Sequence, residues 1–191
     1  MSTVYVISHP EMQVDPAVPV PGWGLSDKGR MRMRAFAASP RVKSVTSIWA
    51  SQEIKATQAA QILADALALP VRLDAALREN DRSATGFLPP KEFEQVADAF
   101  FAEPRASIRG WETAADAQDR IMAAVDALLT LAPAGDVAIV SHGGVGTLLL
   151  CRMLAIPIDR REDQPFQGCL WAFDRTTRRV LSRWASITSG P

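Results

Sequence analysis

The chain has 191 residues, of which 48% are hydrophobic, and its formal net charge at pH 7 is zero. This length and apolar content suffice for one well-buried core, so we expect a single domain over residues 1–191. A neutral chain has no broad electrostatic attraction for nucleic acid or for anionic membranes, so neither is an expected partner.

The first predicted element is a strand over residues 4–7, with the sequence Val-Tyr-Val-Ile. A β-rich apolar run of this kind is typical of a buried central strand in an α/β sheet. Ser8 and His9 follow it directly, at the carboxyl end of the strand. Ligands of open α/β sheets bind outside these ends, so His9 is a candidate site residue. A loop histidine without a role is the structural alternative.

Residues 10–25 are rich in proline and glycine, which predicts a loop passing near this strand end, with Trp23 and Leu25 anchoring it to the body. Ser26 can cap the helix that follows. The apolar positions of that helix at helical spacing are Met31, Ala35 and Ala38. Residues 45–50 are β-branched and aromatic, and they predict a second strand.

A helix ending at Pro70 should follow this strand, and Lys55 falls in its first turn. From there a cation could reach an anion bound by His9, although a solvated surface lysine is the structural alternative. Residues 71–73 form a short predicted strand. The polar segment over residues 77–90 is either a solvated loop or a wall of the site.

Two amphipathic helices are predicted next. Residues 91–101 carry an apolar face at helical spacing. Thr113 opens a sequence that resembles a capping box, with Asp116 in place of Glu or Gln. The buried stripe of the second helix should be Ile121, Val125, Leu128 and Leu129.

Residues 136–142 repeat the opening pattern, because a second apolar run ends in Ser141 and His142. The chain has only two histidines, and both occupy such positions. If the two strands are neighbours, the imidazoles converge over one edge of the sheet. Gly143 and Gly144 permit a sharp turn into a helix, whose N-terminal N–H groups favour an anion. The pair therefore indicates an anionic substrate, with phosphate the leading choice.

Residues 169–173 and 180–185 read as a closing hairpin, so the order of elements predicts a three-layer αβα sandwich with a mostly parallel central sheet. Cys151 and Cys169 form neither a disulfide framework nor a metal pattern, and we expect both to be reduced. No segment approaches the roughly 20 apolar residues of a membrane span, and no basic leader precedes an apolar run. We therefore expect a soluble cytoplasmic protein.

Four short motifs make the chain resemble the histidine phosphatase superfamily, also called phosphoglycerate mutase-like, over nearly its whole length. The family's Arg-His-Gly after the first strand corresponds to residues 8–10, here Ser-His-Pro. Its helix start of the form Ser-x-x-x-Arg-Ala-x-x-Thr-Ala corresponds to the segment that begins with residues 51–59. Its Leu-x-Glu segment corresponds to residues 77–79, and its strand ending Ser-His-Gly to residues 141–143.

The resemblance implies a two-step phosphoryl transfer. His9 would attack phosphorus and form a phosphohistidine, which water then hydrolyses. His142 would stabilise the charge on the phosphoryl oxygens, and Glu79 would protonate the leaving oxygen. Asp81 and Glu11 remain open as alternatives for the acid. Neither a metal nor another cofactor is implied.

Two departures from the family concern the phosphate-binding arginines. Ser8 and Lys55 stand where the family has arginine, and neither offers a planar fork that holds two phosphate oxygens. Arg78 and Arg82 could supply a replacement guanidinium, or they could simply be solvated. The candidate substrate-binding residues are therefore Ser8, Lys55, Arg78, Arg82 and Gly143.

The expected function is a phosphatase that acts through a phosphohistidine on a small phosphorylated metabolite or a phosphoprotein. The alternative is a catalytically weak or inactive phosphate-binding scaffold on the same fold, which the missing arginines favour. A phosphoglycerate mutase is less favoured, because the chain is short and has no evident insertion to enclose a bisphosphate. Trp23, Phe87 and Trp111 could wall the leaving-group side, and Glu112 could line the pocket. The sequence does not indicate an oligomeric state.

Overall fold

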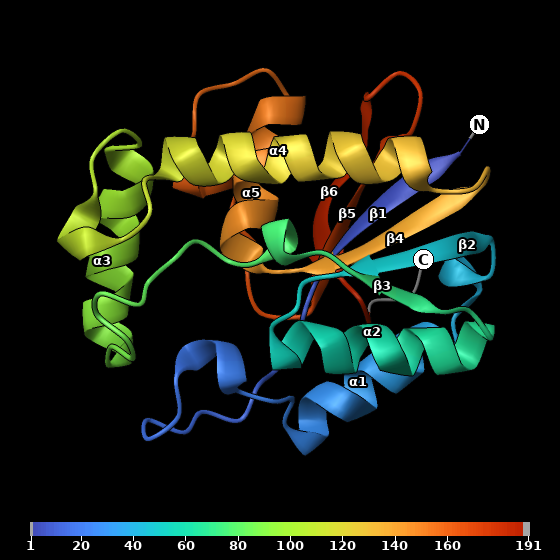
Figure 1. Cartoon of the computed structure of the whole chain (residues 1–191), viewed down its shortest axis with the longest axis horizontal. Coiled ribbons are helices and arrows are strands. Elements are labelled where there is room, and N and C mark those ends of the chain that lie inside the picture. Colours follow the sequence, from blue (N-terminus) through green and yellow to red (C-terminus); the bar gives the residue numbers. More distant parts are fainter. Residues whose placement is uncertain (1, 189–191) are drawn as a thin grey trace.

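A computed structural model describes residues 2–188 and contains a six-stranded sheet with helices on both faces (Figure 1). The strands are β1 (Thr3–Ser8), β2 (Val45–Ala50), β3 (Val71–Leu73), β4 (Asp136–Ser141), β5 (Cys169–Asp174) and β6 (Val180–Ser186). The α-helices are α1 (Asp27–Ala37), α2 (Ile54–Leu67), α3 (Pro90–Ala102), α4 (Ala114–Leu131) and α5 (Gly143–Met153). These bounds agree closely with the elements expected from the sequence.

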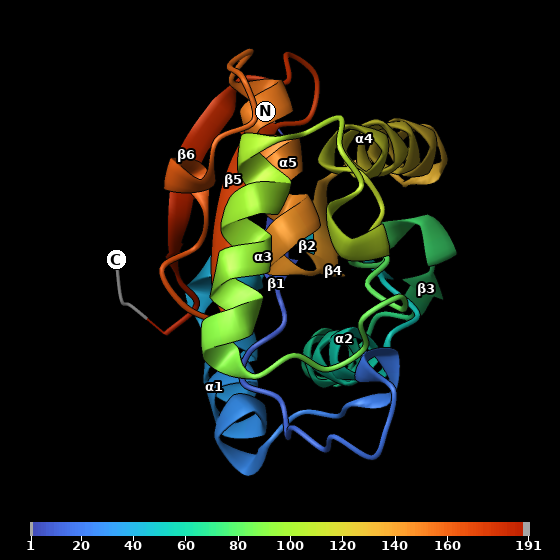
Figure 2. The same ribbon diagram turned by 90° about the vertical axis from the view of Figure 1, so that its left-hand side faces the viewer.

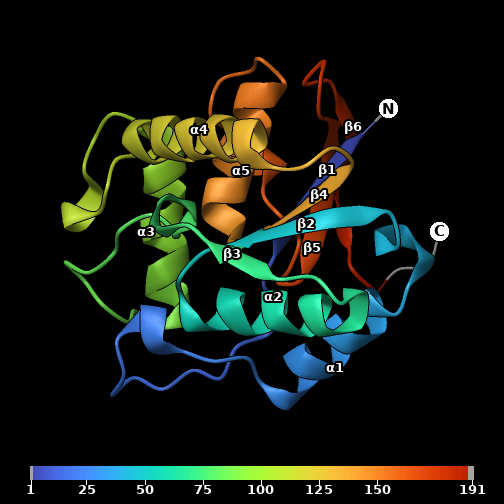
Figure 3. The same ribbon diagram turned by 45° about the vertical axis from the view of Figure 1, so that its right-hand side comes forward.

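The strand order is β3-β2-β4-β1-β5-β6. The first four strands are parallel, whereas β5 runs antiparallel to β1 and forms a hairpin with β6. Strands β1 and β4 are neighbours, with Ser8 opposite Ser141. The predicted three-layer fold with a mostly parallel sheet is confirmed, and β3 and β2 form one edge of it (Figure 3).

Helices α1 and α2 cover one face of the sheet, and α4 and α5 cover the other (Figure 1). Helix α3 stands apart from both pairs, beside the end of α5, and Figure 2 shows it in front of the strands. Since parallel strands end together, this arrangement leaves their carboxyl ends facing α3 and the loops around it. The functional site is therefore expected at the carboxyl ends of the parallel strands.

Helix α1 begins as predicted, because the Ser26 hydroxyl accepts a hydrogen bond from Gly29 N at 3.1 Å. The face expected from Met31 and Ala35 is wrong, since both are exposed. The buried residues are Gly29, Met33, Phe36 and Ala37. This stripe also has helical spacing. It is the buried face because it places the large Phe36 ring against the core.

Gly29→Ala should destabilise the protein by about 1–3 kcal/mol, because a Cβ added at Gly29 would lie 2.1 Å from the backbone oxygen of Glu11. Backbone on both sides leaves little room for relaxation. Met31→Ala on the exposed side of the same helix is the control, and it should change stability by no more than about 0.5 kcal/mol. Denaturant midpoints of the two variants provide the comparison, and equal midpoints would contradict the close approach.

Both cysteines are free and buried, as expected. Over the described range 2–188, no helix has the length and apolarity to cross a membrane. The same range holds no group of three or more His, Cys, Asp or Glu side chains that could bind a metal ion.

Candidate active site

Three adjacent strand ends bring Ser51, His142 and His9 together, because these residues directly follow β2, β4 and β1. The His9 backbone N–H donates to the Ser141 carbonyl at 3.1 Å, which extends the β1–β4 pairing to the histidines. The two imidazole centroids are 5.2 Å apart, with the rings inclined by 70°. The expected convergence of the two histidines is confirmed.

The His9 ring presents Nε2 as its free nitrogen. Nδ1 lies 2.9 Å from the Pro10 carbonyl oxygen, which can only accept, so Nδ1 carries the proton. Burial, together with the nearby charges of His142 and Lys55, lowers the pKa of His9 to about 3. The ring is therefore neutral at physiological pH, and the lone pair on Nε2 is available for attack.

The His142 ring lies on one side of His9, and the β5–β6 hairpin lies on the other. Its Nε2 lies 2.9 Å from the Ser51 hydroxyl and 3.4 Å from Glu53 Oε1, and Nδ1 is buried without a hydrogen-bond partner among the described residues. Burial lowers the pKa of His142 to about 3, because the opposing effect of Glu53 is smaller and Lys55 adds to the lowering.

We expect the free energy of unfolding to fall by about 2 kcal/mol per histidine between pH 7 and pH 5. The unfolded rings bind protons near their ordinary pKa of 6.5, whereas burial keeps the native rings neutral with a pKa of about 3. The native state thus binds fewer protons in this window, and stability is lost as the pH falls. Denaturant titrations of the wild type and His9→Gln at both pH values measure the effect. The variant should lose about half of the histidine contribution, and an identical pH dependence in both proteins would contradict the buried neutral state of His9.

Lys55 is buried beneath the site rather than solvated. It is 1% exposed, and its Nζ lies 2.5 Å from Glu53 Oε2 and 3.0 Å from the Val20 carbonyl oxygen. Burial alone would raise the pKa of Glu53, but the charges of His142 and Lys55 outweigh it and lower that pKa to about 2. Sequence reasoning missed Glu53, because it occupies a position that the family motif leaves variable.

Glu79 occupies the N-terminus of α5. Its carboxylate accepts hydrogen bonds from the backbone N–H groups of Gly144 at 3.1 Å and Val145 at 2.9 Å. The Glu79 backbone N–H donates to Glu53 Oε1 at 2.9 Å. The helix end that was expected to receive an external anion is therefore occupied by a carboxyl group of the protein itself. Gly143, the first residue of α5, lines the cleft beside it.

The two alternatives for the acid lie elsewhere. Asp81 is exposed and accepts a hydrogen bond from Ser83 N within its own loop. Glu11 forms ion pairs with Lys28 and Arg32 at the foot of α1. Of the three carboxylates considered, Glu79 lines the cleft together with His9.

Ser8 does not present its side chain to the cleft. It is fully buried, and its hydroxyl donates to Gln164 Oε1 and accepts from the Cys169 backbone N–H at 3.0 Å. Gln164 does line the cleft, and it packs against Gly143 so closely that a Cβ there would meet its amide nitrogen at 2.1 Å. Sequence reasoning missed Gln164, because the residue lies in an irregular segment 156 positions away from Ser8.

Arg78 and Arg82 play different parts. Arg78 pairs with Glu112 at 3.1 Å, and that carboxylate also receives Arg120 at 2.8 Å. Glu112 therefore braces the Glu79 segment, since Arg120 also donates to the Glu79 carbonyl at 3.3 Å. Arg82 lines the cleft with its guanidinium over aromatic rings, 5.1 Å from the centroid of Phe93 and 5.6 Å from that of Trp111.

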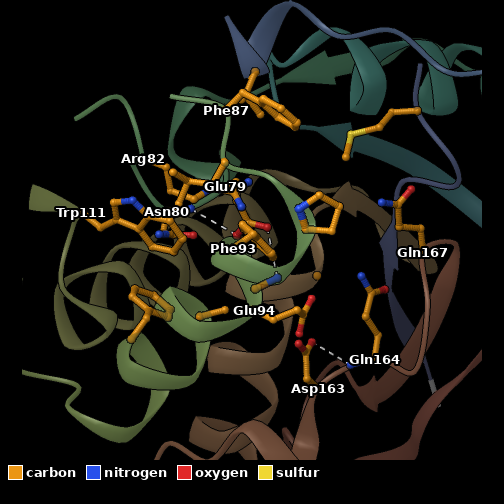
Figure 4. A pocket seen from close by; sticks show the side chains of 18 of the residues that line it. Glu79, Asn80, Arg82, Phe87, Phe93, Glu94, Trp111, Asp163, Gln164 and Gln167 are labelled. Carbon is orange, nitrogen blue, oxygen red and sulfur yellow. Dashed lines mark hydrogen bonds between the residues drawn. The ribbon is translucent and has the colours of Figure 1, made fainter. Parts of the chain in front are cut away.

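The cleft has a volume of about 490 Å³ and opens onto His9 and Glu79 (Figure 4). Trp23 and Phe87 meet edge to face across one side of it, at 5.8 Å between ring centroids. The opposite side carries the polar side chains Glu94, Asp163, Gln164 and Gln167 (Figure 4). A phosphoryl group at His9 would thus have an aromatic and a polar wall beyond it.

Comparison with known proteins identifies the family. The sequence profile of the histidine phosphatase superfamily (branch 1) matches residues 12–181. The chain belongs to this superfamily. The matched range contains Lys55, Glu79 and His142 but begins just after His9, so the assignment of the histidine phosphatase nucleophile to His9 depends on its geometry.

Among curated proteins, a probable phosphoglycerate mutase, GpmB, of Enterobacter sp. (strain 638) is 28% identical over 168 residues, which cover 82% of this chain and 77% of the relative. A mycobacterial glucosyl-3-phosphoglycerate phosphatase, solved with inorganic phosphate, superposes with a TM-score of 0.80 at 20% identity over 100% of both chains. YhfR of Bacillus stearothermophilus gives 0.82 at 22% identity over 99% of this chain and 98% of its own. The two structures show that the fold is shared.

Proposed function

We propose that the protein is a phosphomonoester hydrolase that forms a phosphohistidine at His9 and acts on a small phosphorylated metabolite or a phosphoprotein. The observation that carries this proposal is the pairing of His9 and His142, with ring centroids 5.2 Å apart and Nε2 of a neutral His9 free. Membership of the histidine phosphatase superfamily supports it.

The proposed reaction has two steps. His9 Nε2 attacks phosphorus, the ester P–O bond breaks, and the leaving oxygen takes a proton from Glu79. Water then attacks the phosphohistidine, gives its proton to the Glu79 carboxylate, and releases phosphate and free His9. His142 donates a hydrogen bond to the phosphoryl oxygens in both steps. The hydrogen bonds from Gly144 and Val145 hold Glu79 in place for this exchange.

Trapping the intermediate tests the proposal. The wild type is mixed with p-nitrophenyl phosphate, quenched in alkali within one turnover, and analysed by intact mass and peptide mapping. We expect an acid-labile phosphoryl group on His9, which is absent from His9→Ala. Steady release of p-nitrophenol without phosphoryl transfer to His9 would contradict the mechanism.

A non-catalytic phosphate-binding role is the second candidate. The observation that favours it is the absence of a free guanidinium where the family has arginine, since Ser8 pairs with Gln164 and Lys55 pairs with Glu53. Such a protein would bind phosphate but would neither hydrolyse p-nitrophenyl phosphate nor become phosphorylated.

A mutase role is the third candidate, and the similarity to a probable phosphoglycerate mutase favours it. Conversion of 2-phosphoglycerate to 3-phosphoglycerate, followed by coupled assay with and without a bisphosphate primer, distinguishes it. Transfer faster than release of inorganic phosphate would favour the mutase over the hydrolase.

A further inference from the structure

Glu53 places a carboxylate against His142, next to the proposed phosphoryl site. Its side chain is 10% exposed and bridges two groups, with Oε2 2.5 Å from Lys55 Nζ and Oε1 3.4 Å from His142 Nε2. Its Oε1 also accepts the Glu79 backbone N–H. A carboxylate in this position repels any anion that approaches His142, and the low exposure leaves little water to screen it.

The charged groups around the two imidazoles leave no surplus of positive charge. Lys55 in the first turn of α2 opposes Glu53, the residue before that helix, and Glu79 opposes Arg82 in the segment after β3. Arg120 of α4 also acts on His142 and shares the Glu112 carboxylate with Arg78. Asp163, whose pKa is raised by burial and by Glu79, adds a further carboxyl group on the cleft wall. Burial keeps His9 and His142 neutral. A doubly charged phosphoryl group would therefore enter a site whose fixed charges cancel.

We propose that Glu53 makes this site selective for a singly charged oxyanion, because its carboxylate cancels the Lys55 ammonium and lies against His142. This inference rests on the proposed function in that it takes the oxyanion to bind at His9, beside the His142 ring. A doubly charged oxyanion then binds only together with one proton, which the Glu53–His142 pair takes up. The substrate favoured at neutral pH is correspondingly a phosphoryl group that carries one negative charge.

Sulfate is the probe, because it keeps two charges throughout the range from pH 5.5 to 8.5. Calorimetric titration in two buffers of different ionisation enthalpy counts the protons taken up. For the wild type we expect about one proton per sulfate and an affinity that falls about ten-fold per pH unit. Glu53→Gln keeps the size and the hydrogen-bond acceptor but removes the charge. At pH 8 it should bind sulfate at least about ten-fold more tightly than the wild type, with little proton uptake.

Two control variants separate charge from position. Glu53→Asp keeps the charge and should retain the pH dependence of the wild type. Glu92→Gln removes a half-exposed surface carboxylate that pairs with Arg109, and it should bind sulfate as the wild type does. A gain in affinity on losing Glu53 is opposite to what removal of a merely structural side chain causes.

The outcomes also separate this inference from the proposed function. Sulfate affinity of the wild type that is independent of pH, or equal affinities in the wild type and Glu53→Gln at pH 8, would overturn the role of Glu53 alone. So would a Glu53→Gln protein that hydrolyses phosphomonoesters yet does not bind sulfate. If no variant binds sulfate and none hydrolyses p-nitrophenyl phosphate, both the inference and the proposed function fail.

Discussion

Replacing His9 with alanine should lower kcat/KM for p-nitrophenyl phosphate by at least about 10⁴-fold, because the proposed mechanism needs the His9 imidazole to accept the phosphoryl group. Its Nε2 is the free nitrogen of a neutral ring, and the facing His142 has its Nε2 beside Ser51 and Glu53. Initial rates between pH 5 and pH 8 measure the effect. Equal release of p-nitrophenol by the wild type and the variant would remove His9 from the reaction.

Chemical rescue provides the control for this variant. The space vacated by the His9 ring borders the cleft, so added imidazole can enter and act as the phosphoryl acceptor. We expect partial recovery of turnover in His9→Ala with imidazole and no recovery in a His9→Ala, His142→Ala double variant. An unchanged melting temperature in His9→Ala would show that the loss of activity is chemical and does not come from unfolding.

The fold and the histidine pair were predictable because they follow from local patterns. Two apolar runs each end in Ser-His, so the two histidines meet if these strands are parallel neighbours. The register of β1 and β4 places Ser8 opposite Ser141. Ser26 and Thr113 cap the helices at which they were expected, since capping depends on residues three positions apart. Such short-range rules survive tertiary packing with little change.

The charge balance of the site was not predictable in the same way. Whether Lys55 faces solvent or the core depends on Glu53 and on the Val20 carbonyl group, which packs onto it from a different loop. Likewise the carboxylate at the N-terminus of α5 comes from Glu79, 66 positions before Val145. No local sequence pattern indicates which distant side chain hydrogen-bonds to the N-terminus of a helix.

The two residues that stand where the family has arginine, Ser8 and Lys55, are each bound to another side chain of the protein. At the first position, Ser8 and Gln164 hydrogen-bond to each other. At the second, Lys55 and Glu53 form a buried ion pair. Removing one partner of the Lys55–Glu53 pair leaves a buried charge uncompensated, and removing one partner of the Ser8–Gln164 pair leaves a polar group without its hydrogen bond, so each pair is expected to tolerate joint substitution better than single substitution.

Glu79→Gln should lower kcat/KM by about 10²- to 10⁴-fold for an alkyl phosphate but by much less for p-nitrophenyl phosphate. An alkoxide leaves only if it receives a proton, whereas p-nitrophenolate is stable enough to leave without one. Glutamine keeps one of the two oxygens that accept from the Gly144 and Val145 N–H groups and replaces the other with an NH2 group, so the melting temperature of the variant is measured beside its rates. The measurement compares wild type and variant with both substrates at one pH.

Asp81→Asn is the matched control for this comparison, because that carboxylate is exposed and bonded within its own loop. It should leave the rates for both substrates unchanged. An equal fall in Glu79→Gln for the alkyl and the aryl ester would mean that Glu79 orients the substrate or orders α5, and that the leaving oxygen takes its proton from elsewhere. A fall confined to the alkyl ester assigns the proton to Glu79, because only proton donation distinguishes the two leaving groups.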